Sequence, residues 1–165
     1  MWLAAAIALI AVGTRVFRQP PTAAIPAVGA AFPPLALAPL PGTPELTDAA
    51  LRAGHPTLVN LFASWCLPCR VEAPQLAALR ARGIAVAGIA VRDTPGEVAA
   101  FLAATGTRYT ALGLDPRERV QPALGSSGIP ETWLVDGHGI VRARFRGDLH
   151  AADVPDIAAA VAAVR

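Results

Sequence analysis

The chain contains two cysteines, three positions apart in the run Trp65-Cys66-Leu67-Pro68-Cys69. The run follows an apolar stretch, residues 57–63, that is typical of a buried strand. A helix beginning near Leu67 would place Cys66 at its N-terminus, where free backbone N–H groups and the helix dipole favour a thiolate. Cys66 is therefore the candidate nucleophile. Cys69, one helical turn further on, is placed to attack a mixed disulfide at Cys66 and close an intramolecular disulfide.

Other uses of the cysteine pair remain open. A structural zinc site needs four ligands, and the chain offers no further cysteine and only three isolated histidines, His55, His138 and His150. A metallochaperone would need His55 or His138 to lie beside the pair. A purely structural disulfide is also open, although closing so short a loop removes little entropy from the unfolded chain. The spacing favours a redox-active disulfide that needs no cofactor and no metal.

Length and composition suit one globular domain with an appendage. The chain has 165 residues, of which 54% are hydrophobic and 16% charged. Its net charge is only +2, and all 14 basic residues are arginines. The arginines are dispersed, with no interleaved aromatic residues, so the pattern does not indicate nucleic-acid binding.

The first 18 residues are expected to be a membrane anchor or a signal sequence. An apolar run from Trp2 is stopped by Arg15 and Arg18. As a helix, residues 2–17 would reach about 24 Å, less than the ~30 Å hydrocarbon core. We favour an uncleaved anchor over a cleavable signal peptide, although the positive-inside rule alone would leave the following domain in the cytoplasm. Residues 19–34, rich in proline and alanine, are expected to be a linker, and residues 35–165 the folded domain.

Apolar runs of strand length alternate with helical patterns after the linker, as in an α/β domain. The strands are expected at residues 57–63, 84–91, 132–135 and 140–146. The helices are expected at residues 68–82, 95–105, 117–124 and 154–164.

Local signals refine this arrangement. Pro74 is expected to kink the helix of residues 68–82, because proline removes a backbone donor. Thr94 and Glu97 form a capping-box pattern at the start of the next helix. The turn residues 136–139 predict a hairpin over residues 131–146. A hairpin beside strands joined through helices gives a mixed sheet flanked by helices, which resembles the thioredoxin-like fold.

Four segments resemble the thioredoxin-fold thiol:disulfide interchange proteins of cytochrome c biogenesis, the CcmG/DsbE group, which is TlpA-like. The resemblance extends over about residues 31–149, and the Cys-x-x-Cys-Arg-x-Glu and Gly-x-Pro-Glu-Thr runs are its most specific elements. The segments are Leu58-Val-Asn-Leu-Phe-Ala-Ser-Trp-Cys-Leu-Pro-Cys-Arg-Val-Glu72, Gly88-Ile-Ala-Val-Arg-Asp93, Gly128-Ile-Pro-Glu-Thr-Trp-Leu-Val-Asp136 and Gly139-Ile-Val-Arg-Ala-Arg-Phe-Arg-Gly147.

The resemblance implies roles for residues around the cysteine pair. It makes Pro130 a cis-proline that faces the disulfide, and it places Trp65, Ile129 and Pro130 in the substrate-binding groove. It also implies that Glu72 and Glu131 belong to the active site.

Proton transfer to or from Cys69 falls to Glu72 in this interpretation. Thioredoxins have a buried aspartate at the strand position that Asn60 occupies here, and an asparagine cannot take a proton. Glu72 lies three residues after Cys69, on the same helical face, and is the candidate substitute.

The function implied is reduction of disulfides in cytochrome c maturation, either in apocytochrome c or in a maturation partner. A membrane thiol relay would supply the electrons, because the periplasm is oxidising. The chain would be held at the inner membrane by a single-pass anchor formed by residues 1–18, with its soluble domain in the periplasm. A general thioredoxin-like periplasmic reductase is the alternative, favoured by the Leu67-Pro68 dipeptide.

Overall fold

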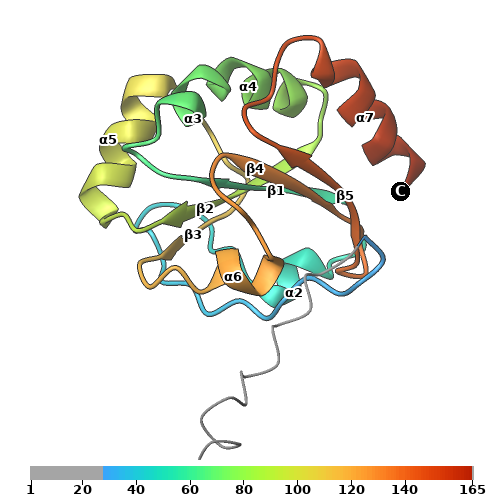
Figure 1. Ribbon diagram of the computed structural model, residues 1–165, viewed down its shortest axis with the longest axis horizontal. Coiled ribbons are helices and arrows are strands. Elements are labelled where there is room, and N and C mark those ends of the chain that lie inside the picture. Colours follow the sequence, from blue (N-terminus) through green and yellow to red (C-terminus); the bar gives the residue numbers. More distant parts are fainter. Residues whose placement is uncertain (1–27, 165) are drawn as a thin grey trace, which may run out of the picture.

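The computed structural model describes residues 28–164. They form a five-stranded sheet in the order β3-β2-β1-β4-β5 (Figure 1). β1 pairs in parallel with β2, and β2 with β3, whereas β4 runs antiparallel to both β1 and β5. The sheet is therefore mixed, as expected. The strands are β1 (Thr57–Phe62), β2 (Ala85–Val91), β3 (Leu112–Asp115), β4 (Glu131–Val135) and β5 (Val141–Arg146).

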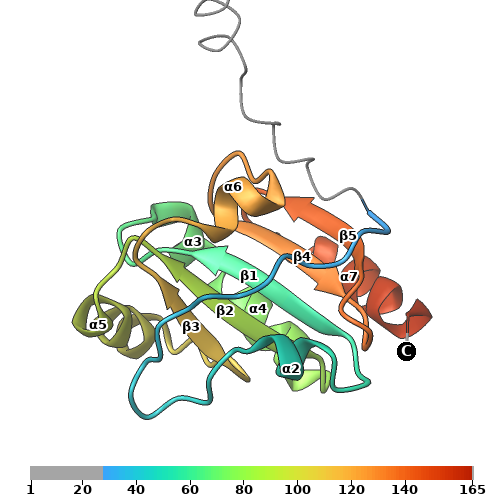
Figure 2. The same cartoon turned by 90° about the horizontal axis from the view of Figure 1, so that it is seen from below.

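Helices cover both faces of the sheet. Figure 1 shows α3, α4, α5 and α7 on one face and α2 and α6 on the other. Figure 2 shows the segment before α2 crossing that second face. Its backbone forms isolated bridges between Ala31 and Ile140 and between Ala38 and Leu114. The helices are α2 (Asp48–Leu51), α3 (Leu67–Val71), α4 (Ala73–Ala81), α5 (Pro95–Thr105), α6 (Val120–Leu124) and α7 (Asp153–Ala163).

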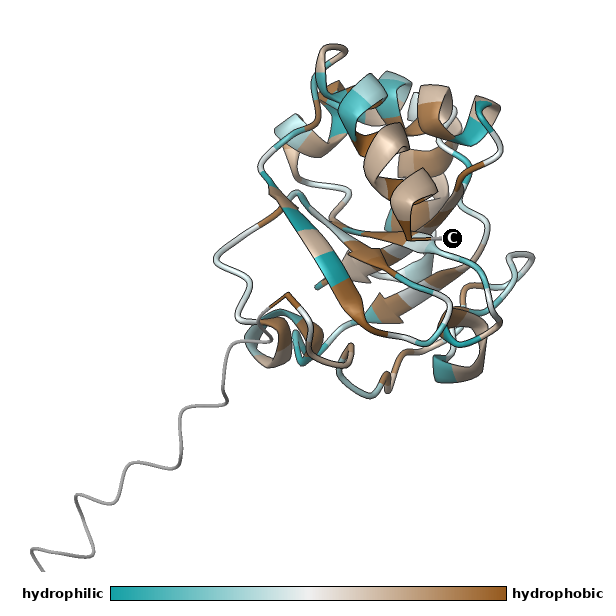
Figure 3. Ribbon diagram, turned by 90° about the vertical axis from the view of Figure 1, so that its right-hand side faces the viewer, coloured by the Kyte–Doolittle hydropathy of each residue, from teal (hydrophilic) through white to brown (hydrophobic). Residues whose placement is uncertain are grey.

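Alternation along β1 divides the core between the two faces, because successive strand residues point in opposite directions. Leu58 packs with Leu79 of α4 and Ile157 of α7. Leu61 belongs to the cluster on the other face, together with Leu124 of α6. Every side chain of β1 is buried, so the strand that leads into the cysteine pair is fixed from both sides. Figure 3 shows the contrast with β5, an edge strand along which hydrophilic and hydrophobic residues alternate.

The four expected strands are present with ends shifted by at most one residue. The helix over Pro95–Thr105 is confirmed with its capping box. Two short elements were not anticipated, α2 and β3. The sequence of β3, Leu-Gly-Leu-Asp, contains two residue types that are depleted in strands, and its pairing with β2 is what holds it in the sheet.

The expected single helix over residues 68–82 is wrong in form: the structure has two helices, α3 and α4, that meet at Glu72. Pro74 causes the break, since it has no N–H to continue the helix and its ring clashes with the preceding turn.

The helix expected at 117–124 begins only at Val120. The Asp115 carboxylate accepts hydrogen bonds from the backbone N–H groups of Arg119 and Val120, and this holds the preceding residues in a turn.

The anchor predicted for residues 1–18 and the first part of the linker lie outside the described residues. Within residues 28–164, no helix has both the length and the apolar character needed to cross a membrane. The last residues assigned to the linker pack against the domain. Gly29 donates to the carbonyl of Val141 at 2.8 Å, and Phe32 is buried in the core.

Candidate active site

The cysteine pair lies where β1 passes into α3. Cys66 and Cys69 form a disulfide, and Cys66 is the N-cap of the helix. The backbone N–H of Cys69 donates to Sγ of Cys66 at 3.2 Å. The structure thus places Cys66 where the sequence predicts it, at a helix N-terminus whose unpaired N–H groups favour a negative charge on sulfur.

Ser64 anchors the turn that carries Trp65 and Cys66. Asp93, which follows β2, accepts hydrogen bonds from the backbone N–H of Ser64 at 2.7 Å and from its hydroxyl at 2.6 Å. The Arg70 guanidinium donates to the Ser64 carbonyl at 2.8 Å. The turn is therefore held from both sides, by a strand end and by the helix that contains the cysteines.

Exposed apolar side chains surround the disulfide. Trp65 is 54% exposed, Leu67 70% and Val71 55%. The Arg92 guanidinium lies over the Trp65 ring, 5.0 Å from its centroid. Exposed apolar side chains next to a reactive group are typical of a binding surface.

A cleft of about 550 Å³ opens beside Trp65 and extends to Ile129. Ile129 also packs against the cluster that contains Cys66 and Cys69. The Ile129–Pro130 peptide bond is cis, as the resemblance implies. The structure thus brings Trp65 and Ile129 together at one cleft next to the disulfide.

One wall of this cleft is an ion pair with unusual backbone geometry. Arg92 Nε lies 3.2 Å from Glu118 Oε1. Both residues have a positive φ of 54°, which is uncommon for residues other than glycine. Their backbone N–H groups donate to the same carbonyl, that of Asp115, at 3.1 and 3.2 Å. This shared acceptor ties the loop after β2 to the loop after β3.

Glu72 is fully buried where α3 meets α4. Its Oε1 accepts a hydrogen bond from Asn60 Nδ2 at 2.9 Å, and its Oε2 accepts one from the Leu149 N–H at 3.1 Å. Burial raises the pKa of Glu72 to about 7, and the charge of Asp148 acts in the same direction, while the two hydrogen bonds oppose the rise. The carboxyl group can therefore exchange a proton near neutral pH.

Glu131 is placed differently from Glu72. It is buried in β4 and pairs with Arg144 of β5, with 2.6 Å between Glu131 Oε1 and Arg144 Nε. Arg144 also lies over the Trp133 ring, 4.6 Å from its centroid, and donates to the Gly125 carbonyl. The negative charge of Glu131 is thus compensated within the protein.

The histidines do not gather at the cysteine pair. His55 precedes β1, whereas Cys66 follows its opposite end. No group of three or more His, Cys, Asp or Glu side chains among residues 28–164 could hold a metal ion.

Three functional contacts were missed by sequence reasoning. Asp93 anchors Ser64, Arg144 pairs with Glu131, and the Tyr109 hydroxyl donates to Asn60 Oδ1 at 2.7 Å. Asp93 and Arg144 lie within the resembling segments, and strand pairing would bring Arg144 close to Glu131. Tyr109 lies in a loop, and no local sequence pattern predicts its hydrogen bond to Asn60.

Comparison with known proteins points to the same kind of protein, one that exchanges thiols and disulfides. The profile of the Redoxin family matches residues 27–161. The thiol:disulfide interchange protein HelX of Rhodobacter capsulatus is 45% identical over 121 residues, covering 73% of this chain and 69% of HelX. The thiol:disulfide interchange protein DsbE homolog of Paracoccus denitrificans is 40% identical over 141 residues, covering 82% of this chain and 78% of that protein.

Among solved structures, a thiol:disulfide interchange protein of the thioredoxin family from Chlorobium tepidum superimposes with a TM-score of 0.65 at 26% identity. The match covers 84% of this chain and 97% of that one. The fold is therefore thioredoxin-like.

Proposed function

Because the chain belongs to the Redoxin family and is a thiol:disulfide oxidoreductase, we propose that it reduces disulfides during cytochrome c maturation. The observation that carries the proposal is the Cys66–Cys69 disulfide at the N-terminus of α3, bordered by exposed apolar side chains. The resemblance to the cytochrome c biogenesis group supplies the pathway. The substrate is the disulfide of apocytochrome c or that of a maturation partner.

The reaction begins from the dithiol form. The Cys66 thiolate attacks one sulfur of the substrate disulfide, which forms a mixed disulfide and releases the other substrate sulfur as a thiolate. Cys69, as a thiolate, then attacks the Cys66 sulfur. The Cys66–Cys69 disulfide forms, and the second substrate sulfur leaves. Two electrons pass to the substrate, and two protons convert its sulfurs to thiols.

Glu72 accepts the proton of Cys69 in the second step. Cys69 is almost completely buried, so water has little access to its thiol. Glu72 lies three residues further along the chain, the spacing that brings two helical side chains to one face. Its pKa of about 7 suits a group that takes and returns a proton at neutral pH.

The substrate chain docks beside the disulfide, on Trp65, Ile129 and Pro130. The cleft that extends from Trp65 to Ile129 accommodates residues next to the reacting cysteine. Glu131 acts on the site through its position after Pro130, and its pairing with Arg144 limits the negative charge that it adds.

The location we propose is the periplasmic side of the inner membrane. Residues 1–18 form the single-pass anchor and the residues after them the linker, while Gly29 and Phe32, at the end of the segment first assigned to the linker, already belong to the thioredoxin-like domain. A membrane thiol relay reduces the Cys66–Cys69 disulfide after each cycle, because the oxidising periplasm does not supply the electrons.

Trapping of partners in cells tests the proposal. A Cys69→Ser variant cannot release the substrate, so the mixed disulfide at Cys66 should accumulate. The variant that carries both Cys66→Ser and Cys69→Ser is the control, because it has no sulfur to form the bond. Recovery of a c-type apocytochrome or a maturation protein from the first variant alone is the expected result. Recovery of many unrelated proteins would instead support the general reductase that the Leu67-Pro68 dipeptide favours.

A further inference from the structure

A chain of hydrogen bonds leads from Tyr109 through the buried Asn60 amide to Glu72 Oε1, the carboxylate oxygen that Leu149 does not contact. The Tyr109 hydroxyl donates to Asn60 Oδ1 at 2.7 Å. The Nδ2 group of the same amide donates to Glu72 Oε1 at 2.9 Å and to Thr132 Oγ1 at 3.0 Å. The oxygen and both N–H groups of the Asn60 amide therefore form hydrogen bonds, with side chains from three different parts of the fold.

The Tyr109 hydroxyl decides which way the Asn60 amide points. Burial raises the pKa of Tyr109 well above its ordinary value, and the charge of Glu72 adds to the rise, so the hydroxyl keeps its proton. A protonated phenol is a donor to an amide oxygen. With Oδ1 held toward Tyr109, the N–H groups have to face Glu72 and Thr132. Without this donor, the amide could turn over and present its oxygen to Glu72.

We propose that Tyr109 is a positioning residue for the redox reaction, which fixes the Asn60 amide so that it donates a hydrogen bond to the Glu72 carboxylate. The inference rests on the proposed role of Glu72 as the proton acceptor for Cys69. Tyr109 itself touches neither the substrate nor the reacting sulfurs in this proposal. Its effect on the reaction passes through Asn60.

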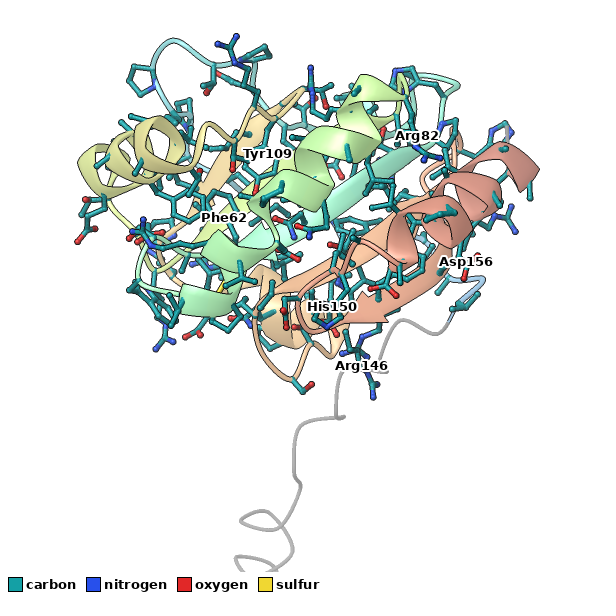
Figure 4. All side chains as sticks on the ribbon, turned by 90° about the horizontal axis from the view of Figure 1, so that it is seen from above. Phe62, Arg82, Tyr109, Arg146, His150 and Asp156 are labelled. Atoms are coloured by element: carbon teal, nitrogen blue, oxygen red, sulfur yellow. A yellow bond between two sulfur atoms is a disulfide. The ribbon has the colours of Figure 1, made fainter. Side chains whose placement is uncertain are left out.

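The surroundings of Tyr109 hold its ring in place. The ring stacks on Phe62 of β1, with centroids 5.0 Å apart, and Figure 4 shows both side chains between α4 and α5. Gly88 of β2 also borders the ring, because a Cβ atom there would come within 2.9 Å of three ring carbons. Glycine at this position leaves the space that the ring fills, which is a known reason for glycine inside a strand.

Other charged and titratable groups around Glu72 are few among the described residues. Asp148, in the loop after β5, acts on Glu72 through its charge. Asp148 in turn lies 3.9 Å from His150 Nδ1. The measurement therefore follows Glu72 directly and uses a control variant that leaves Asp148 and His150 untouched.

The test is a Tyr109→Phe variant, which removes only the hydroxyl. The pH titration of the Glu72 side-chain carboxyl carbon is followed by NMR in the oxidised protein. In the wild type we expect a midpoint near 7. In Tyr109→Phe we expect the midpoint to rise by about one pH unit, because the carboxylate loses a donor and the protonated acid can gain an acceptor.

Thr132→Val is the matched control. It removes a hydroxyl from the same network but leaves the Tyr109–Asn60 hydrogen bond. The midpoint of the Glu72 titration in this variant should therefore equal that of the wild type. An unchanged midpoint in Tyr109→Phe would overturn the proposal. An equal rise in both variants would also overturn it, because it would indicate a general loosening of the site.

Kinetics separate this inference from the proposed function. In single-turnover experiments, the rate at which Cys69 releases a peptide from the mixed disulfide should rise with pH through the Glu72 midpoint, and Tyr109→Phe should move that rise to higher pH by the same amount. If the NMR midpoint shifts but the rates do not follow it, the positioning of Glu72 stands and its role as proton acceptor fails.

Discussion

The proton on Glu72 should couple the stability of the oxidised protein to pH. The carboxyl group has a pKa of about 7 when folded, against an ordinary value of 4.5, chiefly because it is buried. Between these values the folded state binds a proton that the unfolded chain has lost. Stability is therefore lost as pH rises from 4.5 through 7, and the loss is complete above the folded pKa.

The size of this effect follows from the two pKa values. Their difference of roughly 2.5, at about 1.4 kcal/mol for each unit, corresponds to about 3 kcal/mol. A Glu72→Gln variant has no proton to lose. The free energy of unfolding of the variant minus that of the wild type should therefore increase by about 3 kcal/mol between pH 4 and pH 8.

The assay is urea unfolding at both pH values, without reductant so that the disulfide stays closed. The change between pH 4 and pH 8 is compared across variants, because this comparison cancels any pH-independent cost of the substitution. Glu97→Gln is the control: hydrogen bonds from Thr94 lower the pKa of Glu97, so its contribution has the opposite sign. A gain smaller than about 1 kcal/mol in Glu72→Gln would refute the reasoning, because the buried carboxyl would then have an ordinary pKa.

Three further outcomes are expected. Arg144→Met should lower the free energy of unfolding by about 3 kcal/mol, because it removes the close partner of the buried Glu131 charge and leaves only the exposed Arg146, whose Nε lies 3.9 Å from Glu131 Oε1; adding Glu131→Gln should recover most of the loss in urea unfolding. Trp65→Ala should raise KM for a peptide disulfide while leaving oxidation of the dithiol by a small disulfide nearly unchanged, since the exposed ring contacts only an extended substrate. Gly88→Ala should cost about 1 to 3 kcal/mol in thermal or urea unfolding, because its methyl group would displace the Tyr109 ring; a neutral result would show that the ring moves freely.

The sequence predicts the elements that position the cysteine pair because these carry strong local signals. The apolar run of β1 and the capping box of α5 depend on neighbours along the chain, and both are found where expected. The helix after the cysteines shows the limit of such signals. Pro74 indicated a kink, whereas in the structure α3 ends before it and a second helix, α4, begins at Ala73.

The contacts of the site residues could not be predicted in the same way. Glu72 and Glu131 are both acids in resembling motifs, yet one is held by neutral donors and the other by an arginine. The difference arises from residues far away in sequence, Leu149 for Glu72 and Arg144 for Glu131. Contacts between residues so far apart in sequence produce no periodic pattern from which they could be predicted.

The double anchoring of Ser64 by Asp93 and Arg70 has a consequence for the choice of partner. Attack on a disulfide requires the three sulfurs to lie nearly in a line, and a nucleophile on a rigid turn cannot swing to meet its target. The target has to bring its own bond into alignment. We therefore expect disulfides in unfolded or loosely held polypeptides to react faster than those fixed inside a folded protein.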